Sequence, residues 1–205
     1  MLNRHAREFF TKLLTPLAKW LLKLGITPDT VTVVGTLGSV LGALILYPMG
    51  QLFWGTMVIT AFIFSDVVDG IMARLPNYES KHDGRWGNFL DSTMDRLGDG
   101  SIFAGVAIWF FMGGNNPAIA IAALACLVSG SLVSYARAKA ESLGFDANVG
   151  IAERAERLVL TLVFTGLTGL GLNEWVLFSV LVLLALASVV TVFQRAWKVR
   201  AQAFS

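Results

Sequence analysis

Apolar residues gather along the chain in six stretches, at 30–47, 52–73, 88–112, 117–138, 153–171 and 174–195. Each stretch is close to the roughly 20 residues that an α-helix needs to cross the hydrocarbon core of a bilayer. Short segments rich in Gly, Pro and Asn separate several of them, and longer polar connections lie at 74–87 and 137–152. The pattern predicts an all-α integral membrane protein with six transmembrane helices.

The segment before the first stretch has a different pattern. In residues 2–24 apolar side chains recur at steps of three and four, and Lys and Arg lie between them. This periodicity predicts an amphipathic helix in the membrane surface, with its basic groups toward the headgroups. Pro16 would either kink that helix or begin it. A soluble helix packed on a partner is the alternative, which the apolar stretches that follow disfavour.

Charge supports a membrane protein and gives it an orientation. Charged residues make up only 15% of the chain, against about 25% in soluble domains. All 16 Lys and Arg lie at the two ends of the chain, around the 74–87 connection and the start of the third stretch, or at 137–157. Six alternating spans place these clusters on one side, which the positive-inside rule identifies as the cytoplasm. We therefore expect a multi-pass protein of the cell membrane with both termini cytoplasmic.

The same pattern predicts the domain organisation. We expect residues 1–205 to form one membrane domain, in which residues 1–25 are a juxtamembrane amphipathic helix and residues 30–200 approximately are the six-helix bundle. Nothing in the charge pattern indicates a nucleic-acid partner.

Four aspartates lie at the charged ends of the second and third stretches, where ionisable residues are costly and usually functional. Asp66 and Asp69 are three residues apart, and Asp91 and Asp95 are four apart, so each pair shares a helical face. The connection between the two helices makes them antiparallel, and the end of one is then level with the start of the other. The spacing predicts four carboxylates at a similar depth.

Four neighbouring carboxylates repel one another, so either their pKa values rise or cations neutralise them. Ligand sets made only of oxygen favour Mg²⁺, Mn²⁺ or Ca²⁺, and two such ions suit phosphoryl chemistry. Gly70 would let a ligand approach the backbone, and Arg74 offers a fork for phosphate oxygens. Alternatively, the aspartates are solvated or paired with nearby arginines. Asp99, one turn beyond Asp95, is interpreted as a structural residue.

The residues of this region match a known signature. Asp66, Asp69, Gly70, Ala73 and Arg74 are followed, after a spacer, by Gly87, Asp91 and Asp95. The arrangement resembles D-x-x-D-G-x-x-A-R and G-x-x-x-D-x-x-x-D of the CDP-alcohol phosphotransferases, an enzyme family. The spacer, residues 75–86, is longer than is usual in that family, which puts the contacts of this loop in doubt.

The resemblance implies six transmembrane helices, a homodimer and a polar cavity open to the cytoplasm. It implies that Asp66, Asp69, Asp91 and Asp95 hold metal, two ions of Mg²⁺ or Mn²⁺, and that Asp95 is the general base, with Asp91 also catalytic. It further implies that the CDP moiety is contacted by residues of the signature and of the start of the first stretch, namely Gly70, Ala73, Arg74, Asp29 and Thr32.

Segments 1–7, 84–93, 134–141 and 150–157 are similar to one branch of this family, the actinobacterial phosphatidylinositol phosphate synthases. That likeness implies that CDP-diacylglycerol, a membrane lipid, donates its phosphatidyl group to inositol phosphate. A phosphorylated acceptor needs its own anion site, which basic groups can form. The candidates lie near the cytoplasmic ends of the last three stretches: Ser134, Arg137, Lys139, Arg154, Arg157 and Arg195.

Among these candidates Lys139, Arg157 and Arg195 are preferred, although each could be an ordinary membrane anchor. Charge does not distinguish inositol phosphate from glycerol 3-phosphate, so a phosphatidylglycerophosphate synthase is the close alternative. A cation transporter is a remote one, because the outer halves of the stretches lack acidic residues. A non-catalytic scaffold leaves the aspartate spacing unexplained.

Overall fold

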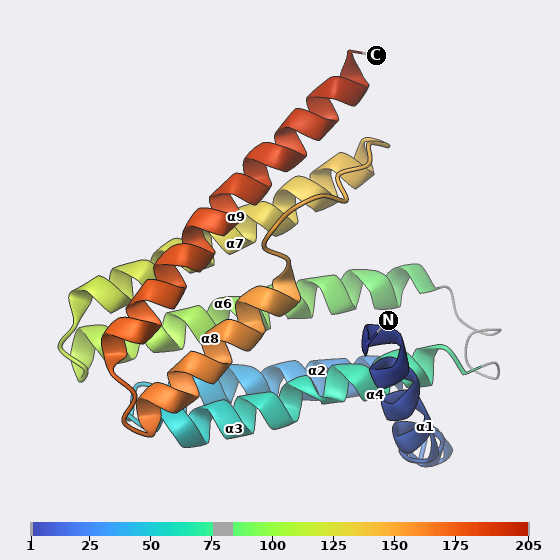
Figure 1. The fold of residues 1–205 in the computed structure, drawn as a ribbon. Helices are drawn as coiled ribbons and strands as arrows, with labels where there is room; N and C mark the ends of the chain where they lie inside the picture. The colour runs from blue at the N-terminus through green and yellow to red at the C-terminus, as the bar shows by residue number, and fades with distance from the viewer. Residues whose placement is uncertain (1, 76–83, 205) are drawn as a thin grey trace. The chain divides into compact units, whose positions relative to one another are not determined.

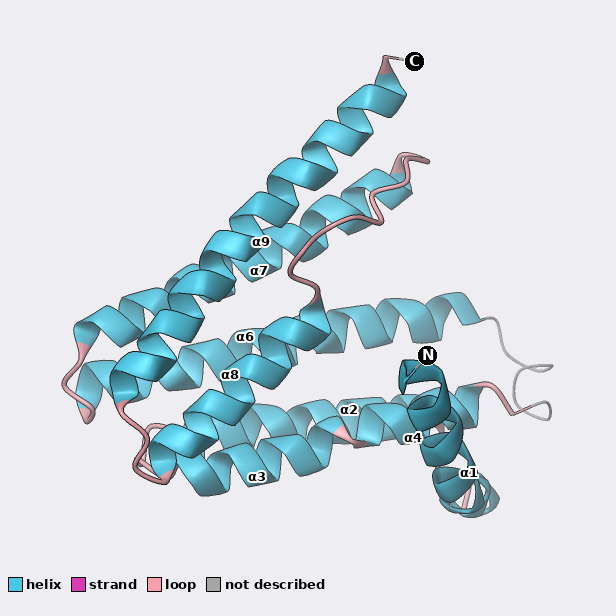
Figure 2. Cartoon of the chain, in the orientation of Figure 1, coloured by secondary structure: helices cyan, strands magenta, loops and turns pink. Residues whose placement is uncertain are grey.

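The computed structural model describes residues 2–75 and 84–204, with side chains described for 13–65, 67–75 and 84–204. All regular structure in these ranges is helical (Figure 2), as the hydropathy pattern predicts. The helices are α1 (Leu2–Lys23), α2 (Pro28–Leu41), the π-helix η1 (Gly42–Leu46), α3 (Leu52–Ile63), α4 (Ser65–Ala73), α6 (Gly84–Met112), α7 (Pro117–Ser142), α8 (Arg154–Gly169) and α9 (Glu174–Ala203). Most of the long spacer falls on residues 76–83, outside the described residues.

Each of the six apolar stretches is helical, and four of them are long and apolar enough to cross a membrane. These four are Pro28–Leu46, Leu52–Ala73, Pro117–Ser142 and Glu174–Ala203. The other two differ for identifiable reasons, since α8 has only 16 residues and the first half of α6 carries the charged residues of the signature. A count of six spans therefore stays a prediction.

Two of the spans are less regular than the hydropathy pattern predicts. The first ends in the π-helical turn η1, and the second is interrupted at Phe64, between α3 and α4. Pro48 lies two residues beyond η1, whereas the break at Phe64 has no proline, and Phe64 itself keeps a right-handed helical conformation. Hydropathy gives the length of an apolar segment but not the local hydrogen-bond pattern, so sequence periodicity did not predict these breaks.

The chain divides into two compact units, which are described separately. Unit 1 comprises Met1–Leu41 and Val58–Gly98. In it α1 and α2 both pack against α4 (Figure 1), which carries the first half of the aspartate signature. The core of this packing contains Ala18 from α1 and Val68, Ile71 and Met72 from α4. Helix α4 is therefore held by two neighbouring helices.

Unit 2 comprises Gly42–Met57 and Asp99–Ser205. Helices α7 and α9 pack side by side, and α8 packs against α9 (Figure 1). Their buried contacts include a bond from the Cys126 thiol to the carbonyl of Leu181, 3.0 Å from sulfur to oxygen. At one end Asn116 donates its amide to the carboxylate of Glu174, over 2.8 Å, which joins the starts of α7 and α9.

Within unit 2, α6 lies very close to the π-helical turn. A Cβ atom on Gly105 would collide with the carbonyl oxygen of Ala43, whereas a Cβ on Gly100 would meet nothing within 4 Å. Backbone cannot move aside as a flexible side chain can. This approach therefore requires glycine at position 105 but not at position 100.

We expect Gly105→Ala to lower the thermal unfolding temperature of the detergent-purified protein by several degrees, since overpacking typically costs about 1–3 kcal/mol. Gly100→Ala in the same helix is the matched control and should leave that temperature unchanged or raise it, because alanine favours helix. Equal unfolding temperatures for the two variants would contradict the close packing.

Candidate active site

The first candidate site, in unit 1, begins with a hydrogen bond between two predicted site residues. Thr32, in the second turn of α2, donates its hydroxyl to Oδ2 of Asp69 on α4 over 2.5 Å. The residue Asp69 is only 5% exposed. A buried carboxylate is costly unless hydrogen bonds and charge offset its lost hydration. The structure thus joins a predicted nucleotide-contact residue to a predicted metal ligand.

Gly70 and Arg74 lie one helical turn apart at the end of α4. A Cβ atom on Gly70 would stand 3.3 Å from Nη2 of Arg74, so the guanidinium folds back across the glycine. Ala73 and Arg74 are exposed. The small residues leave the backbone and the arginine fork accessible, as the sequence predicts for phosphate contacts.

The second half of the signature lies at the start of α6, which runs along α2. Trp86 donates its indole N–H to Oδ2 of Asp29 over 2.9 Å, and further along, Gly98 approaches the methyl group of Thr36. Helix α2 therefore contacts both helices that carry the signature, at Asp69 on α4 and at Trp86 on α6. The indole contact to Asp29 was not foreseen from the sequence.

The acidic residues of α6 differ in exposure. Asp91 is exposed, whereas Asp95 is half-buried and has Nη2 of Arg96 at 3.8 Å from its Oδ2. Among the described side chains no group of three or more His, Cys, Asp or Glu lies close enough to hold a metal ion. The side chain of Asp66 lies outside the described residues, so the convergence of four carboxylates stays a prediction. Their donor chemistry, carboxylate oxygen, fits Mg²⁺ or Mn²⁺.

The second candidate site, in unit 2, contains two buried arginines. Arg157 on α8 is 3% exposed and Arg195 on α9 is 4% exposed. Arg195 donates from Nε to the carbonyl of Val149 over 2.9 Å and from Nη1 to that of Val133 over 2.6 Å. Arg157 donates from Nη1 to the carbonyl of Ala152 over 2.9 Å.

Both guanidinium groups lie against the same turn of α7. A Cβ atom on Gly130 would stand 3.2 Å from Nε of Arg157, and Arg195 binds the carbonyl of Val133, three residues further on. Ser134, half-buried beside them, donates its hydroxyl to the carbonyl of Gly130. The structure thus brings Ser134, Arg157 and Arg195 to one region.

No carboxylate is hydrogen-bonded to Arg195 in the described residues, although Glu153 and Glu141 act on its charge from further away. Its hydrogen bonds go to two backbone carbonyls, and within the described part of the chain it forms no ion pair. A guanidinium stays protonated and has five N–H donors, so two carbonyls leave donors over. Because burying a charge without a counter-charge is costly, an anion that reached these donors would be stabilised.

The remaining predicted acceptor residues are placed differently. Arg137 pairs with Glu141 one turn along α7, 2.8 Å from Nε to Oε1. Arg154 pairs with Asp99, with Nε at 3.1 Å from both carboxylate oxygens, which agrees with a structural role for Asp99. Lys139 is exposed near the end of α7. The sequence predicted charge at each position but not which arginines would find carboxylate partners.

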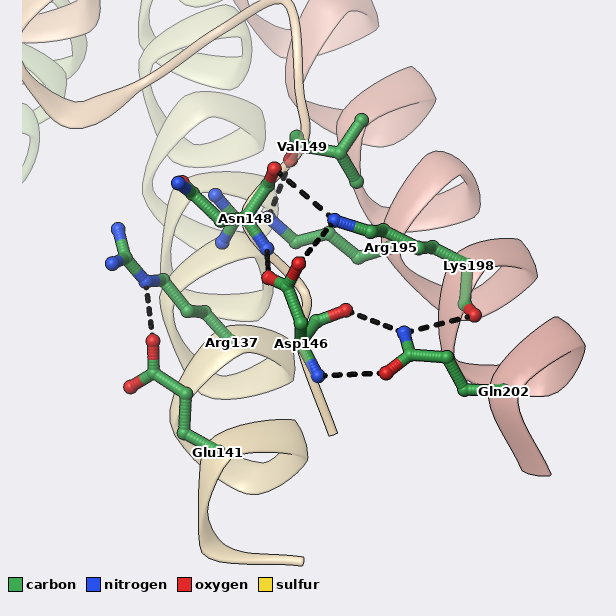
Figure 3. Close-up of polar contacts among 8 residues, drawn as sticks. All are labelled: Arg137, Glu141, Asp146, Asn148, Val149, Arg195, Lys198 and Gln202. Atoms are coloured by element: carbon green, nitrogen blue, oxygen red, sulfur yellow. Dashed lines mark hydrogen bonds and ion pairs between the residues drawn. The ribbon is translucent and has the colours of Figure 1, made fainter. Parts of the chain in front are cut away.

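Residues 143–153, which connect α7 to α8, form a strap that is bound along one face of α9 (Figure 3). Asp146 accepts from Nζ of Lys198 over 2.7 Å. Gln202 accepts from the backbone N–H of Asp146 over 2.9 Å and donates to its carbonyl over 2.7 Å. Sequence reasoning missed this strap, although polar residues at 191, 195, 198 and 202 recur at helical steps.

Comparison with known proteins identifies the family of the chain. Residues 25–197 match the sequence profile of the CDP-alcohol phosphatidyltransferases. The chain belongs to this family of membrane enzymes, which confirms the resemblance drawn from the aspartate signature. The match covers both units.

Among its relatives are phosphatidylinositol phosphate synthases. The one from Streptomyces avermitilis is 49% identical over 98% of this chain and 83% of its own. The one from Mycolicibacterium smegmatis is 45% identical over 95% of this chain and 86% of its own. The homology therefore extends over nearly all of this chain and over most of each relative.

Solved structures of the Mycobacterium tuberculosis phosphatidylinositol phosphate synthase share the fold. One with CDP-DAG bound has a TM-score of 0.85 and 40% identity, covering 92% of this chain and 94% of that one. Another, in complex with manganese and citrate, has a TM-score of 0.84 and 41% identity, covering 91% and 88%.

The strap gives a prediction about pH. The hydrogen bond from Lys198 lowers the pKa of Asp146 below its ordinary value, and the backbone N–H of Asn148 acts in the same direction. A lowered folded-state pKa adds stability that is complete above the unfolded pKa of about 3.9 and is lost as pH falls through the folded pKa. From pH 6 to pH 3 the unfolding temperature of the wild type should therefore fall slightly more than that of Asp146→Asn. A steeper fall in the variant would contradict this assignment.

Proposed function

We propose that this chain transfers the phosphatidyl group of CDP-diacylglycerol to inositol phosphate, giving phosphatidylinositol phosphate and CMP. Family membership supports the reaction class, and the relatives named phosphatidylinositol phosphate synthases support the acceptor. The observation that carries the acceptor side is Arg195, a buried cation whose hydrogen bonds go to neutral carbonyls. It offers an anion site built from residues of unit 2, none of which belongs to the aspartate signature.

In the donor site, Asp66, Asp69, Asp91 and Asp95 would hold the divalent ions. Bound there, such ions offset the charge of the pyrophosphate and stabilise CMP as the leaving group. Thr32 fixes the carboxylate of Asp69 by its hydrogen bond. Gly70, Ala73, Arg74 and Asp29 contact the CDP moiety, with Arg74 binding phosphate oxygens through its fork.

The acceptor hydroxyl attacks the phosphorus nearest the diacylglycerol. A new phosphorus–oxygen bond forms there, the bond to the CMP oxygen breaks, and the hydroxyl proton passes to Asp95, assisted by Asp91. The phosphate of the acceptor is bound in unit 2 by Arg157, Arg195 and Ser134. Arg137, Lys139 and Arg154 contribute to the positive field around it.

The proposal includes the arrangement in the membrane. We place six spans in the bilayer, both termini and the site on the cytoplasmic side, and α1 in the interface. On α1 a second apolar stripe, Leu13, Leu17 and Trp20, is exposed and not packed on α4, and Leu24 just after the helix is exposed as well. This is expected for a helix whose outer face contacts lipid. On the basis of the family resemblance, we also propose that the protein forms a homodimer.

The acceptor assignment is tested by incubating the purified protein with CDP-diacylglycerol and either labelled inositol phosphate or labelled glycerol 3-phosphate. Mg²⁺ and Mn²⁺ are compared, and a chelator serves as the blank. We expect labelled lipid from inositol phosphate, in the presence of either ion, and none with the chelator. If labelled lipid formed from glycerol 3-phosphate alone, the assignment of inositol phosphate as the acceptor would be wrong, while the reaction class would stand.

The catalytic assignment is tested by Asp91→Asn and Asp95→Asn, with CMP release as the measurement. Each should lower kcat by about 100-fold or more, because positioned proton transfer is worth roughly 10²–10⁴ and Asn neither binds metal as a carboxylate does nor accepts a proton. Glu174→Gln is the matched control, since that carboxylate binds Asn116 at the opposite end of α9 from Arg195. CMP release that survives both aspartate changes would exclude this mechanism.

A further inference from the structure

The hydroxyl of Thr191 is the central contact between α9 and the strap. Thr191 is fully buried. Its Oγ1 accepts from the backbone N–H of Ile151 over 3.2 Å and of Ala152 over 3.1 Å, and it donates to the carbonyl of Ala187 over 2.9 Å. One side-chain oxygen therefore fixes two successive backbone groups of the strap.

These backbone groups lead directly to the buried arginines. Ala152 gives its N–H to Thr191 and its carbonyl to Nη1 of Arg157. Val149, three residues earlier in the strap, gives its carbonyl to Nε of Arg195. The strap thus determines the direction of both guanidinium groups, and Thr191 determines the position of the strap between them.

The backbone shape of the strap agrees with this arrangement. Gly150 has a φ of +151°, and a Cβ atom there would collide with Cγ2 of Thr191. Glycine is the residue that permits both that conformation and so close an approach. The strap is therefore seated directly on Thr191 at the point between the carbonyls that hold Arg195 and Arg157.

We propose that Thr191 is a positioning residue for the acceptor phosphate, acting through the strap on Arg157 and Arg195. Thr191 does not touch the acceptor. Its hydroxyl holds the Ile151 and Ala152 amides, and the strap carbonyls then fix the orientation of the two guanidinium groups that we assign to the anion. The inference rests on the proposed function, and it adds a residue that lies outside both the aspartate signature and the set of basic side chains.

The competing interpretation is that Thr191 only stabilises the fold. The two roles differ in which kinetic constant they change. If the guanidinium groups of Arg157 and Arg195 lose their orientation, only the binding of the acceptor weakens. A general loss of packing instead lowers the amount of active enzyme and the unfolding temperature, and it does not affect one substrate more than the other. A change in KM for the acceptor without a change in KM for CDP-diacylglycerol therefore distinguishes a positioning role from a purely structural one.

The test compares Thr191→Val, which keeps the shape but removes the hydroxyl, with Thr191→Ser, which keeps the hydroxyl. Thr165→Val is the matched control, because the Thr165 hydroxyl is buried on α8 and has no hydrogen-bond partner within the described residues. For each protein KM for inositol phosphate, KM for CDP-diacylglycerol, kcat and the unfolding temperature are measured.

We expect Thr191→Val to raise KM for inositol phosphate by about tenfold, the lower end of what is lost at metal sites when a residue that orients a ligand is removed. Its KM for CDP-diacylglycerol and its kcat should stay near the wild-type values. Thr191→Ser and Thr165→Val should behave as wild type. Should Thr191→Val fail to fold, Gly150→Ala tests the same idea by displacing the strap, and it should show the same selective rise.

The outcomes separate this inference from the proposed function. A wild-type enzyme that does not use inositol phosphate overturns the proposed function. An active wild type with an unchanged acceptor KM in Thr191→Val, or with both Michaelis constants changed together, overturns the role of Thr191 and leaves the proposed function in place. Failure of Thr191→Ser to restore the acceptor KM would also overturn that role.

Discussion

A charged group inside an apolar helical protein must find a counter-charge or hydrogen bonds, since its hydration is lost. This constraint organises both units. In unit 1 the buried carboxylate of Asp69 is held by the hydroxyl of Thr32. In unit 2 the buried guanidinium of Arg195 is held by backbone carbonyls. Because the hydrogen-bond partners of Arg195 are neutral, we place the anionic group of the acceptor beside it.

Features that depend on a single segment of the chain could be predicted from the sequence. Within the described residues, apolar runs predicted the helical stretches from α2 to α9, though not the breaks at η1 and Phe64. The step of three and four predicted α1. Both signals depend on one chain segment at a time. The aspartate signature predicted the family because it is a local pattern of uncommon residues. The family of the chain, its helical content and the order of its helices were therefore predicted from the sequence.

What the sequence did not predict depends on pairs of distant residues. The sequence does not distinguish Arg154 from Arg195. In the structure Arg154 is hydrogen-bonded to the carboxylate of Asp99, whereas Arg195 is hydrogen-bonded to backbone carbonyls. The strap on α9 joins residues 39–56 positions apart, and hydropathy carries no information on such contacts. The breaks at η1 and Phe64 likewise depend on local backbone bonding.

The account as a whole depends on the four signature aspartates acting together as a site for divalent ions. Anomalous diffraction from crystals of this protein grown with Mn²⁺ and CDP-diacylglycerol tests it most directly. We predict manganese peaks bound by carboxylate oxygens of Asp66, Asp69, Asp91 and Asp95, with the pyrophosphate on the same ions. Well-ordered nucleotide with no manganese at these carboxylates, or with manganese held elsewhere, would contradict the account.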